Sequence, residues 1–385
     1  MQTVTELARA LVSIPSHEDE TAAGDAIEAW LREHADADVL RDAAGNVIAR
    51  KGSGDVSLAL VGHHDVVPPA DEQTDEDGGY VVEVRDGRLY GRGAADMKGA
   101  VAAAMVAFRD ADPSCELVFA SFVGEEVGGT GARAAIEGTA DARGRSGSEA
   151  RGDASEARGS GADSRGGFAP DYAIVGEGST NYSAEGVTDV VVAHKGRRGS
   201  TITARGEAVH ASVPETGVNA VYRACDAVDV VRDMAFPAVE VFGERVRGSV
   251  AVTGIDGGSA WNVVPETCTV TVDERTVPGE RAPLERVEEI EGVTWRVDQD
   301  LPPMACDDEA FAETVLDAAR RVQEGEPQLV TKPHATDAGW LAQAGTTCVV
   351  CGASEPGEAH TKTESVGLDV LDRCYRIYRN AAESL

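Results

Sequence analysis

The sequence predicts an α/β protein in which a mixed sheet is flanked by helices and interrupted by an inserted α+β domain. Near-continuous apolar runs, such as residues 56–62 and 115–122, alternate with helical segments, as expected for strands buried on both faces of a sheet. Strands alternate more densely over 188–298. A chain of 385 residues is long enough for two domains. We expect one domain from 1–187 with 299–385, and the other from 188–298.

The first domain is expected to open with two helices over residues 1–35, the second from about 19 to 34. Strands are then predicted in the segments GNVIARKG, VSLALVGHHDVV, CELVFASFVGEEVGG and DYAIVGEGST. Helices are predicted in DMKGAVAAAMVAFRDA and from GARAAIEG onward. A helix over 306–323, a strand in GTTCVVCGAS and a helix over 364–382 complete this domain.

The inserted domain is predicted from period-two alternation. Strands are expected in DVVVAHKGRRGSTITARG, GSVAVTGIDGGSA and TCTVTVDERTV, and a helix around 217–234 separates them. Residues 139–168 are a low-complexity stretch almost without large apolar residues. Such a segment cannot offset the entropy of ordering, so we expect a disordered surface loop there.

The charge balance is strongly acidic. There are 67 Asp and Glu against 35 Lys and Arg, a formal net charge of −32, and the acids are spread along the whole chain. This surface argues against nucleic acid and anionic membranes as partners. Salt screens such self-repulsion, so we expect a salt-adapted protein from a halophile.

Location and redox state are also suggested by the sequence. The sequence contains no window of 18 or more apolar residues, so no membrane-spanning helix is expected. The first residues lack the basic and apolar regions of a signal peptide, and a cytoplasmic protein is therefore expected. Seven cysteines without regular spacing argue against a disulfide framework. Cys348 and Cys351 lie in an apolar strand segment and are interpreted as core residues rather than a zinc or redox site.

Acids and histidines recur where predicted strands end or glycine-rich turns begin. The carboxyl ends of strands are where sites form in open α/β sheets. Histidines and carboxylates without cysteine suit zinc or cobalt. These candidate residues are His63, Asp65, Asp96, Glu125, Glu126, Glu177 and His360.

At these positions the chain resembles the dinuclear zinc deacylase and carboxypeptidase family, which includes acetylornithine deacetylases, succinyl-diaminopimelate desuccinylases, aminoacylases and carboxypeptidase G. The matching segments follow the family order over nearly the whole chain. They are GHHDVVPP, LYGRGAADMKGA, VGEEVGGTGA, IVGEGST, GEAVHASVPETGVNA, NVVPETCTVTVDERTVP, ATDAGWLAQAG and AHTKTESV. The resemblance implies a zinc-peptidase-like catalytic domain and a ferredoxin-like inserted domain that serves as lid and dimerisation domain.

The resemblance also assigns the two adjacent histidines. The family pattern is His-x-Asp, and only His63 stands two residues before Asp65. Side chains two apart on a strand share a face, so His63 and Asp65 point together and His64 points away. We therefore expect His63 to bind metal, Asp65 to orient its ring, and His64 to pack in the sheet or loop.

The family implies two Zn²⁺ or Co²⁺ ions bridged by Asp96, with a cis peptide bond after it. One ion would take His63, Asp96 and Glu177. The other would take Asp96, Glu126 and His360. The family's general base corresponds to Glu125, which would move protons between water and the leaving amine.

The inserted domain is implied to supply substrate contacts. His210 matches a histidine that reaches across a homodimer to the scissile carbonyl, where it would stabilise an oxyanion. Asn262 and Arg275 match residues that hold the substrate carboxylate. A surface ion pair between Asp273 and Arg275 is the alternative for the arginine. Thr336, with its neighbour Asp337, matches a turn near the substrate.

The expected activity is hydrolysis of the amide bond of a small N-acyl amino acid, in lysine or arginine biosynthesis. The motifs do not separate N-succinyl-diaminopimelate from N-acetylornithine, or from lysine or ornithine linked to a protein. Two alternatives stay open: a metallocarboxypeptidase or dipeptidase, and a metal-binding relative without catalysis. Two turns depart from the family pattern: GEGST, which has a glycine after Glu177, and CGASEPGEAHT, which contains His360.

Overall fold

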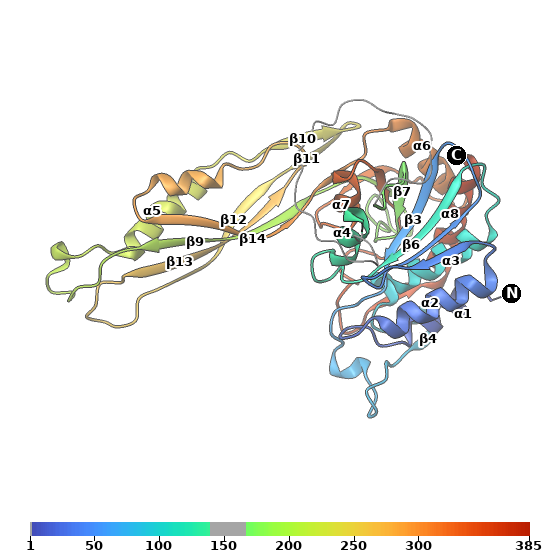
Figure 1. Cartoon of the computed structure of the whole chain (residues 1–385), viewed down its shortest axis with the longest axis horizontal. Helices are drawn as coiled ribbons and strands as arrows, with labels where there is room; N and C mark the ends of the chain where they lie inside the picture. The colour runs from blue at the N-terminus through green and yellow to red at the C-terminus, as the bar shows by residue number, and fades with distance from the viewer. Residues whose placement is uncertain (1, 139–166) are drawn as a thin grey trace, which may run out of the picture. The chain divides into compact units, whose positions relative to one another are not determined.

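The computed structural model describes residues 2–138 and 167–385, which divide into two compact units (Figure 1). The first unit comprises Met1–Val192, Cys306–Val330 and Thr336–Leu385, and the second comprises Ala193–Ala305 and Thr331–Ala335. Most of the low-complexity stretch, residues 139–166, lies outside the described residues. Phe168 was predicted to belong to that loop, but it is buried and makes an edge-on ring contact with Phe122.

Most strands of a nine-stranded mixed sheet belong to the first unit. Its order is β1-β2-β6-β3-β7-β17-β8-β15, and β16 also pairs with β8. The pairs β3–β6, β3–β7 and β7–β17 are parallel. The bounds are β1 Asp38–Arg41, β2 Val47–Lys51, β3 Ser57–His63, β6 Glu116–Phe122, β7 Tyr172–Val175, β8 Val190–His194, β15 Met304–Ala305, β16 Leu329–Lys332 and β17 Thr347–Val350.

The apolar runs explain why β3, β6 and β7 occupy the middle of this sheet. In β3 and β6 every residue after the first is buried, so both faces are covered. The helix that follows the Asp96 turn, α3 (Gly99–Asp110), is buried along most of its length, and its small side chains let it lie against β3 and β6. The packing of α3 against β3 and β6 holds the carboxyl ends of the parallel strands in place.

Helices cover the sheet in two groups. Helices α1, α2, α3 and α8 pack on one another, and α4 packs on α7. Figure 1 shows these two groups on opposite sides of β3 and β6. The bounds are α1 Val4–Val12, α2 Thr21–His34, α4 Thr130–Glu137, α6 Glu309–Arg320, α7 Ala338–Gln343 and α8 Leu368–Ser384. A small sheet of order β18-β5-β4 adds Ser365–Gly367, Arg88–Tyr90 and Glu83–Arg85.

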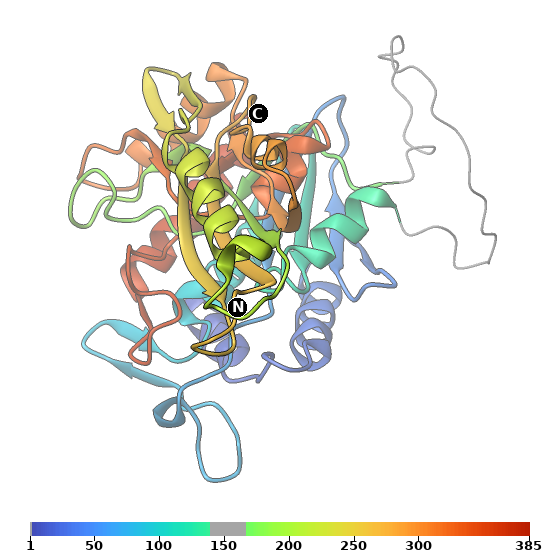
Figure 2. The same ribbon diagram turned by 90° about the vertical axis from the view of Figure 1, so that its left-hand side faces the viewer.

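The second unit is built on an antiparallel sheet of order β12-β13-β9-β14, with α5 and a 3-10 segment packed against it (Figures 1 and 2). Side chains of β9 and β13 alternate between a core that includes Ile202, Val270 and Val272 and a threonine-rich opposite face. The bounds are β9 Gly196–Arg205, α5 Ala220–Arg232, β12 Ser249–Gly257, β13 Thr267–Thr276 and β14 Val293–Leu301, with a separate hairpin of β10 Ala238–Val241 and β11 Glu244–Arg247.

The unit boundaries differ from those expected at 187/188 and 298/299. The segment DVVVAHKGRRGSTITARG is two strands, and the first of them, β8, pairs with β17 in the large sheet. At the other end β14 continues to Leu301. Within the residues the structure describes, no helix is both long and apolar enough to cross a membrane.

Candidate metal centre

The three central parallel strands bring their carboxyl ends to one edge of the large sheet. His63 is the last residue of β3, and its register partner on β6 is Phe122. Glu125 and Glu126 follow β6, and Glu177 follows β7. Because these strands are neighbours, residues distant in sequence converge there, as expected for sites of open α/β sheets.

Asp96 joins two groups of potential ligands. It lies in the turn before α3, and the peptide bond between Asp96 and Met97 is cis, as the resemblance implies. Its Oδ1 lies 3.2 Å from His63 Nε2, and its Oδ2 lies 3.0 Å from His360 Nε2. Each carboxylate oxygen thus faces a different histidine, which is the arrangement a bridging ligand needs.

The remaining carboxylates complete the two groups. Glu177 Oε1 lies 3.3 Å from His63 Nε2, and Glu126 Oε1 lies 2.9 Å from His360 Nε2. The donor atoms of His63, Asp96 and Glu177 lie within 4.8 Å of one another, and so do those of Asp96, Glu126 and His360. The structure therefore brings together all five residues predicted as metal ligands, in the two sets predicted.

Asp65 contacts both His63 and the backbone that carries Glu125 and Glu126. Its carbonyl oxygen and Oδ1 lie 3.1 and 3.3 Å from His63 Nδ1. Its Oδ1 and Oδ2 also accept hydrogen bonds from the backbone N–H groups of Glu125 and Glu126, at 3.1 and 3.0 Å. Asp65 is therefore placed to orient the His63 ring, and it also fixes the start of the turn that carries both glutamates, which sequence reasoning did not anticipate.

His64 lies away from the candidate ligands. Its side chain is fully buried, and Nδ1 lies 2.9 Å from the Ser121 hydroxyl on β6. Burial lowers the pKa of His64 to about 3, so the ring stays neutral at physiological pH. The prediction that His64 packs within the fold is confirmed.

The protein groups of the site are strongly coupled electrostatically. Burial alone would lower the pKa of His63, but its hydrogen bonds to Asp65, Asp96 and Glu177 raise it well above the ordinary value. Hydrogen bonds to Asp96 and Glu126 raise the pKa of His360 to about 10. Burial acts against ionisation of Asp96, yet its two histidine partners hold the pKa of that carboxyl well below its usual range. The carboxylates therefore stabilise positive charge between them.

Glu125 lies beside these groups without belonging to either set. Burial raises its pKa well above the ordinary value, and the negative charges of Asp337, Glu177 and Asp96 add to that rise. Asp337, at the start of α7, is itself buried, and burial raises its pKa to about 7. Thr336 is buried directly before it, and its hydroxyl accepts the backbone N–H of Ala338 at 3.2 Å.

A buried ion pair supports the Asp96 turn and was missed from sequence. Glu364 is paired with Arg92 at 2.5 Å, and both side chains are buried. The other oxygen of Glu364 accepts the backbone N–H groups of Ala95 and Asp96, at 3.0 and 3.1 Å. In the sequence, this pairing is indicated only by the position of the two residues in motifs of the family pattern, Arg92 in GRGAADMKG and Glu364 in AHTKTES. Their separation along the chain concealed the pairing.

Two of the predicted substrate residues meet at one end of the second unit. His210 pairs with Val263 in an isolated bridge, and the N–H of Ala211 donates to the Asn262 carbonyl at 2.9 Å. His210 is exposed, and its Nδ1 lies 2.7 Å from the Ser212 hydroxyl. This end of the unit therefore presents both side chains outward.

Arg275 is not brought to that end. It lies eight positions from Thr267 along β13, about 27 Å at the usual rise of an antiparallel strand. Its Nε is paired with Asp273 Oδ1 at 2.8 Å, and Asp273 also pairs with Arg197. The structure thus contains the ion pair that was the alternative interpretation of Arg275.

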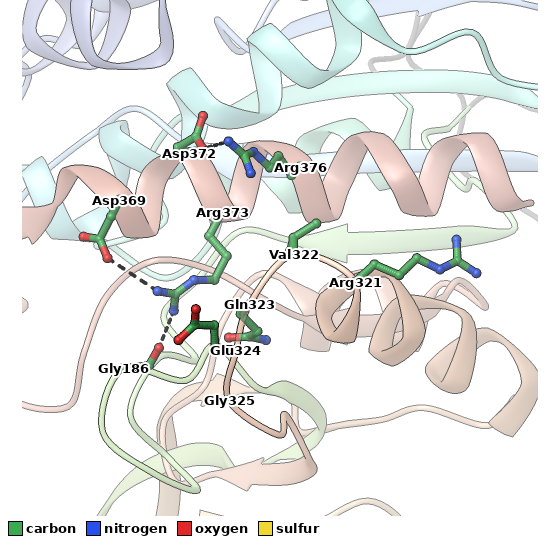
Figure 3. A pocket seen from close by; sticks show the side chains of 10 residues that line it. All are labelled: Gly186, Arg321, Val322, Gln323, Glu324, Gly325, Asp369, Asp372, Arg373 and Arg376. Carbon is green, nitrogen blue, oxygen red and sulfur yellow. Dashed lines mark hydrogen bonds and ion pairs between the residues drawn. The ribbon is translucent and has the colours of Figure 1, made fainter.

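One cavity in the first unit is lined by none of the predicted site residues. This cavity of about 660 Å³ lies between the C-terminal end of α6 and the first turns of α8 (Figure 3). Two of the arginines that line this cavity already have partners. Arg376 pairs with Asp372 at 2.7 Å, and Arg373 donates to the Gly186 carbonyl at 2.5 Å. The cavity is therefore separate from the candidate metal centre.

The donor set fits a divalent metal of zinc type. Two imidazoles and three carboxylates supply nitrogen and oxygen ligands, and no cysteine sulfur belongs to either set of the described residues. Fold and site together define a metal-dependent hydrolase. The model of the peptidase family M20/M25/M40 matches residues 59–384, and the chain belongs to this family.

Relatives of known name support the same assignment. The chain is 30% identical over 357 residues to an acetylornithine deacetylase from Myxococcus xanthus, covering 87% of this chain and 83% of that protein. It is 27% identical over 364 residues to a succinyl-diaminopimelate desuccinylase from Bordetella avium, covering 90% and 88%.

Solved structures share the fold. The aminopeptidase PepT from Bacillus cereus matches with a TM-score of 0.77 and 18% identity, covering 99% of this chain and 97% of that one. An M20 family metallo-carboxypeptidase from Sulfolobus solfataricus matches with a TM-score of 0.71 and 12% identity, covering 100% and 99%. At these identities the similarity establishes the architecture and no substrate.

Proposed function

We propose that this protein hydrolyses the amide bond of a small N-acyl amino acid, as a biosynthetic deacylase of the acetylornithine deacetylase or succinyl-diaminopimelate desuccinylase type. The observation that carries the proposal is the pair of ligand sets that share Asp96, with Glu125 beside them. The names of the two relatives, each matched over most of its length, supply the substrate class.

The ligand sets would hold two Zn²⁺ or Co²⁺ ions, one on His63, Asp96 and Glu177 and the other on Asp96, Glu126 and His360. Bound ions would supply charge stabilisation at the scissile carbonyl and lower the pKa of the attacking water. Asp65 would keep Nδ1 of His63 engaged so that Nε2 faces the ion.

Glu125 would carry the proton. Its carboxylate accepts a proton from the water that adds to the carbonyl carbon. The C–N bond then breaks, and Glu125 returns the proton to the leaving amine nitrogen, which gives a carboxylate and a free amine. Retention of Glu125 beside all five candidate ligands argues against a metal-binding relative without catalysis.

The second unit would act as a lid and as the dimerisation domain of a homodimer. His210 would donate to the developing oxyanion, and Asn262 would bind the substrate carboxylate. Within one protomer Arg275 lies at the opposite end of β13 from Asn262, so it would bind that carboxylate only from the partner protomer of the homodimer, after releasing Asp273. Thr336 would contribute from its turn before α7.

The test is amide hydrolysis by the purified protein in high salt with added Zn²⁺ or Co²⁺. The panel holds N-succinyl-diaminopimelate, N-acetylornithine, N-acetylmethionine and a dipeptide, each with and without chelator. Chelator-sensitive turnover of one of the first two substrates is expected. Turnover of the dipeptide alone would favour the peptidase alternative, and two bound metals without any turnover would overturn the proposal for this panel.

A further inference from the structure

His360 lies in a part of the first unit without regular secondary structure. It stands between β17 and β18, its φ is +66°, and its side chain is 49% exposed. A residue other than glycine rarely adopts that backbone conformation unless its surroundings impose it. Contacts elsewhere in the segment 355–365 therefore help to hold the backbone of His360 where its imidazole reaches Asp96 and Glu126.

The guanidinium of Arg88, on β5, makes those contacts on both sides of His360. Before His360, Nη1 lies 3.0 Å from Glu355 Oε1 and Nη2 lies 3.3 Å from Glu358 Oε1. After His360, Nε donates to the Ser365 hydroxyl at 2.9 Å, and Nη2 donates to the Ser365 carbonyl at 3.2 Å. One side chain thus joins three points of the segment.

The segment is tightened further by contacts among these same partners. Asn181 Nδ2 donates to the second oxygen of Glu355 at 2.9 Å, and the Ser365 hydroxyl lies 3.4 Å from Glu358 Oε2. The Thr361 hydroxyl donates to the Glu358 carbonyl at 2.9 Å. A lysine could not replace Arg88 here, because only a planar guanidinium presents several donors in fixed directions.

We propose that Arg88 is the positioning residue for His360: it holds segment 355–365 in the conformation that brings the imidazole to Asp96 and Glu126, and so sets the affinity of the second metal position. The inference rests on the proposed metal centre. The hydrogen bonds and ion pairs described above for Arg88 all go to Glu355, Glu358 and Ser365, so we infer that it acts on His360 through the segment. His63 is the last residue of β3 and Glu177 follows β7, so the large sheet positions both of them without Arg88.

The test is Zn²⁺ titration of chelator-treated protein, with Arg88→Met as the variant and Arg85→Met as the control. Arg85 is the cross-strand partner of Arg88 on β4, but it is exposed and pairs only with Glu83 among the acidic residues described. In Arg88→Met one ion is expected to keep its affinity, and the ion at the position that uses His360 to lose about 10- to 100-fold, the usual effect of removing an outer partner of a metal ligand. Arg88→Lys should recover only part of this loss, and Arg85→Met should match the wild type.

A second variant, Glu355→Gln with Glu358→Gln, keeps Arg88 and removes its ionic partners, so the test does not depend on Arg88→Met folding. It should weaken the same ion. Unchanged affinity for both ions in either variant would overturn the proposal, as would an equal loss in Arg85→Met. A wild type that binds two ions but hydrolyses no substrate would refute the proposed function and leave this result standing. A wild type that binds a single ion would overturn both.

Discussion

Two adjacent glutamates illustrate how neighbouring residues acquire different roles. Asp65 accepts the backbone N–H of each, so the turn presents both side chains to the site from a fixed start. Glu126 reaches His360 and Asp96, whereas Glu125 lies in neither ligand set. The backbone thus separates a candidate ligand from a candidate base.

This separation predicts different results for two alanine substitutions. Glu125→Ala should leave metal content intact and lower kcat by about 10²- to 10⁴-fold, the usual contribution of a general base. Glu126→Ala should lower metal content as well, because it removes a ligand. Metal analysis after dialysis, combined with turnover, distinguishes the two. Activity that survives in Glu125→Ala would show that the base has been assigned wrongly.

His64 makes a prediction about stability and pH. Its pKa is about 3 in the fold and near 6.5 when unfolded, so the unfolded chain binds more protons between these values. The stability that comes from burying a neutral ring is full above pH 6.5 and is lost as pH falls toward 3. Urea unfolding of chelator-treated His64→Gln should therefore show a shallower loss of unfolding free energy from pH 7 to pH 5 than the wild type. Parallel curves would mean that this ring does not titrate on unfolding.

At the scale of elements, the start of α6 depends on one side chain. The Asp308 carboxylate accepts the N–H groups of Ala310 and Phe311, at 2.9 and 3.1 Å, and also the Tyr172 hydroxyl at 3.0 Å. These hydrogen bonds, that of Phe311 first, lower the pKa of Asp308. The residue therefore joins α6 to β7 as well as capping the helix.

Asp308→Ala should lower the free energy of unfolding by about 1 kcal/mol, the typical cost of losing such a cap. Asp308→Asn is the matched control, since asparagine also caps helices. Asp308→Asn should retain most of the free energy of unfolding. It should lose only the contribution that depends on ionisation of Asp308. In the wild type that contribution is present above the unfolded pKa of the carboxyl and is lost as pH falls. Equal destabilisation by both changes, measured by denaturant unfolding at pH 7, would assign the effect to charge rather than to capping.

Sequence reasoning was most successful where a pattern is local. The apolar runs of β3 and β6 identify buried strands, and period-two alternation separates His63 from His64. Short elements such as α7 carry too few residues for a period to show, and this helix was not predicted. The contacts of Arg88 and Glu364 join residues more than 260 positions apart, and no local pattern encodes them.

At the scale of the whole molecule, the positive charge comes mainly from arginine and only to a small extent from lysine. Only five of the 35 basic residues are lysines, and of these Lys362 alone is exposed. Lys98 and Lys332 are buried, and Lys98 donates to the Ile14 carbonyl at 2.6 Å. The exposed positive charge is therefore carried almost entirely by arginine, whose guanidinium can pair with two carboxylates at once, as Arg88 does.

This charge distribution predicts that added salt stabilises the fold. With a net charge of −32, like charges repel across the surface, and the Debye length falls from about 10 Å at 0.1 M salt to about 3 Å at 1 M. Tm should rise steeply with NaCl below about 0.5 M and then level off, since repulsion is largely screened by then. Na₂SO₄ at equal ionic strength should give the same early rise and, through exclusion of sulfate from the surface, a further increase at high concentration. A Tm that is independent of NaCl would show that the surface acids are already neutralised within the fold, and would remove the physical basis for salt adaptation.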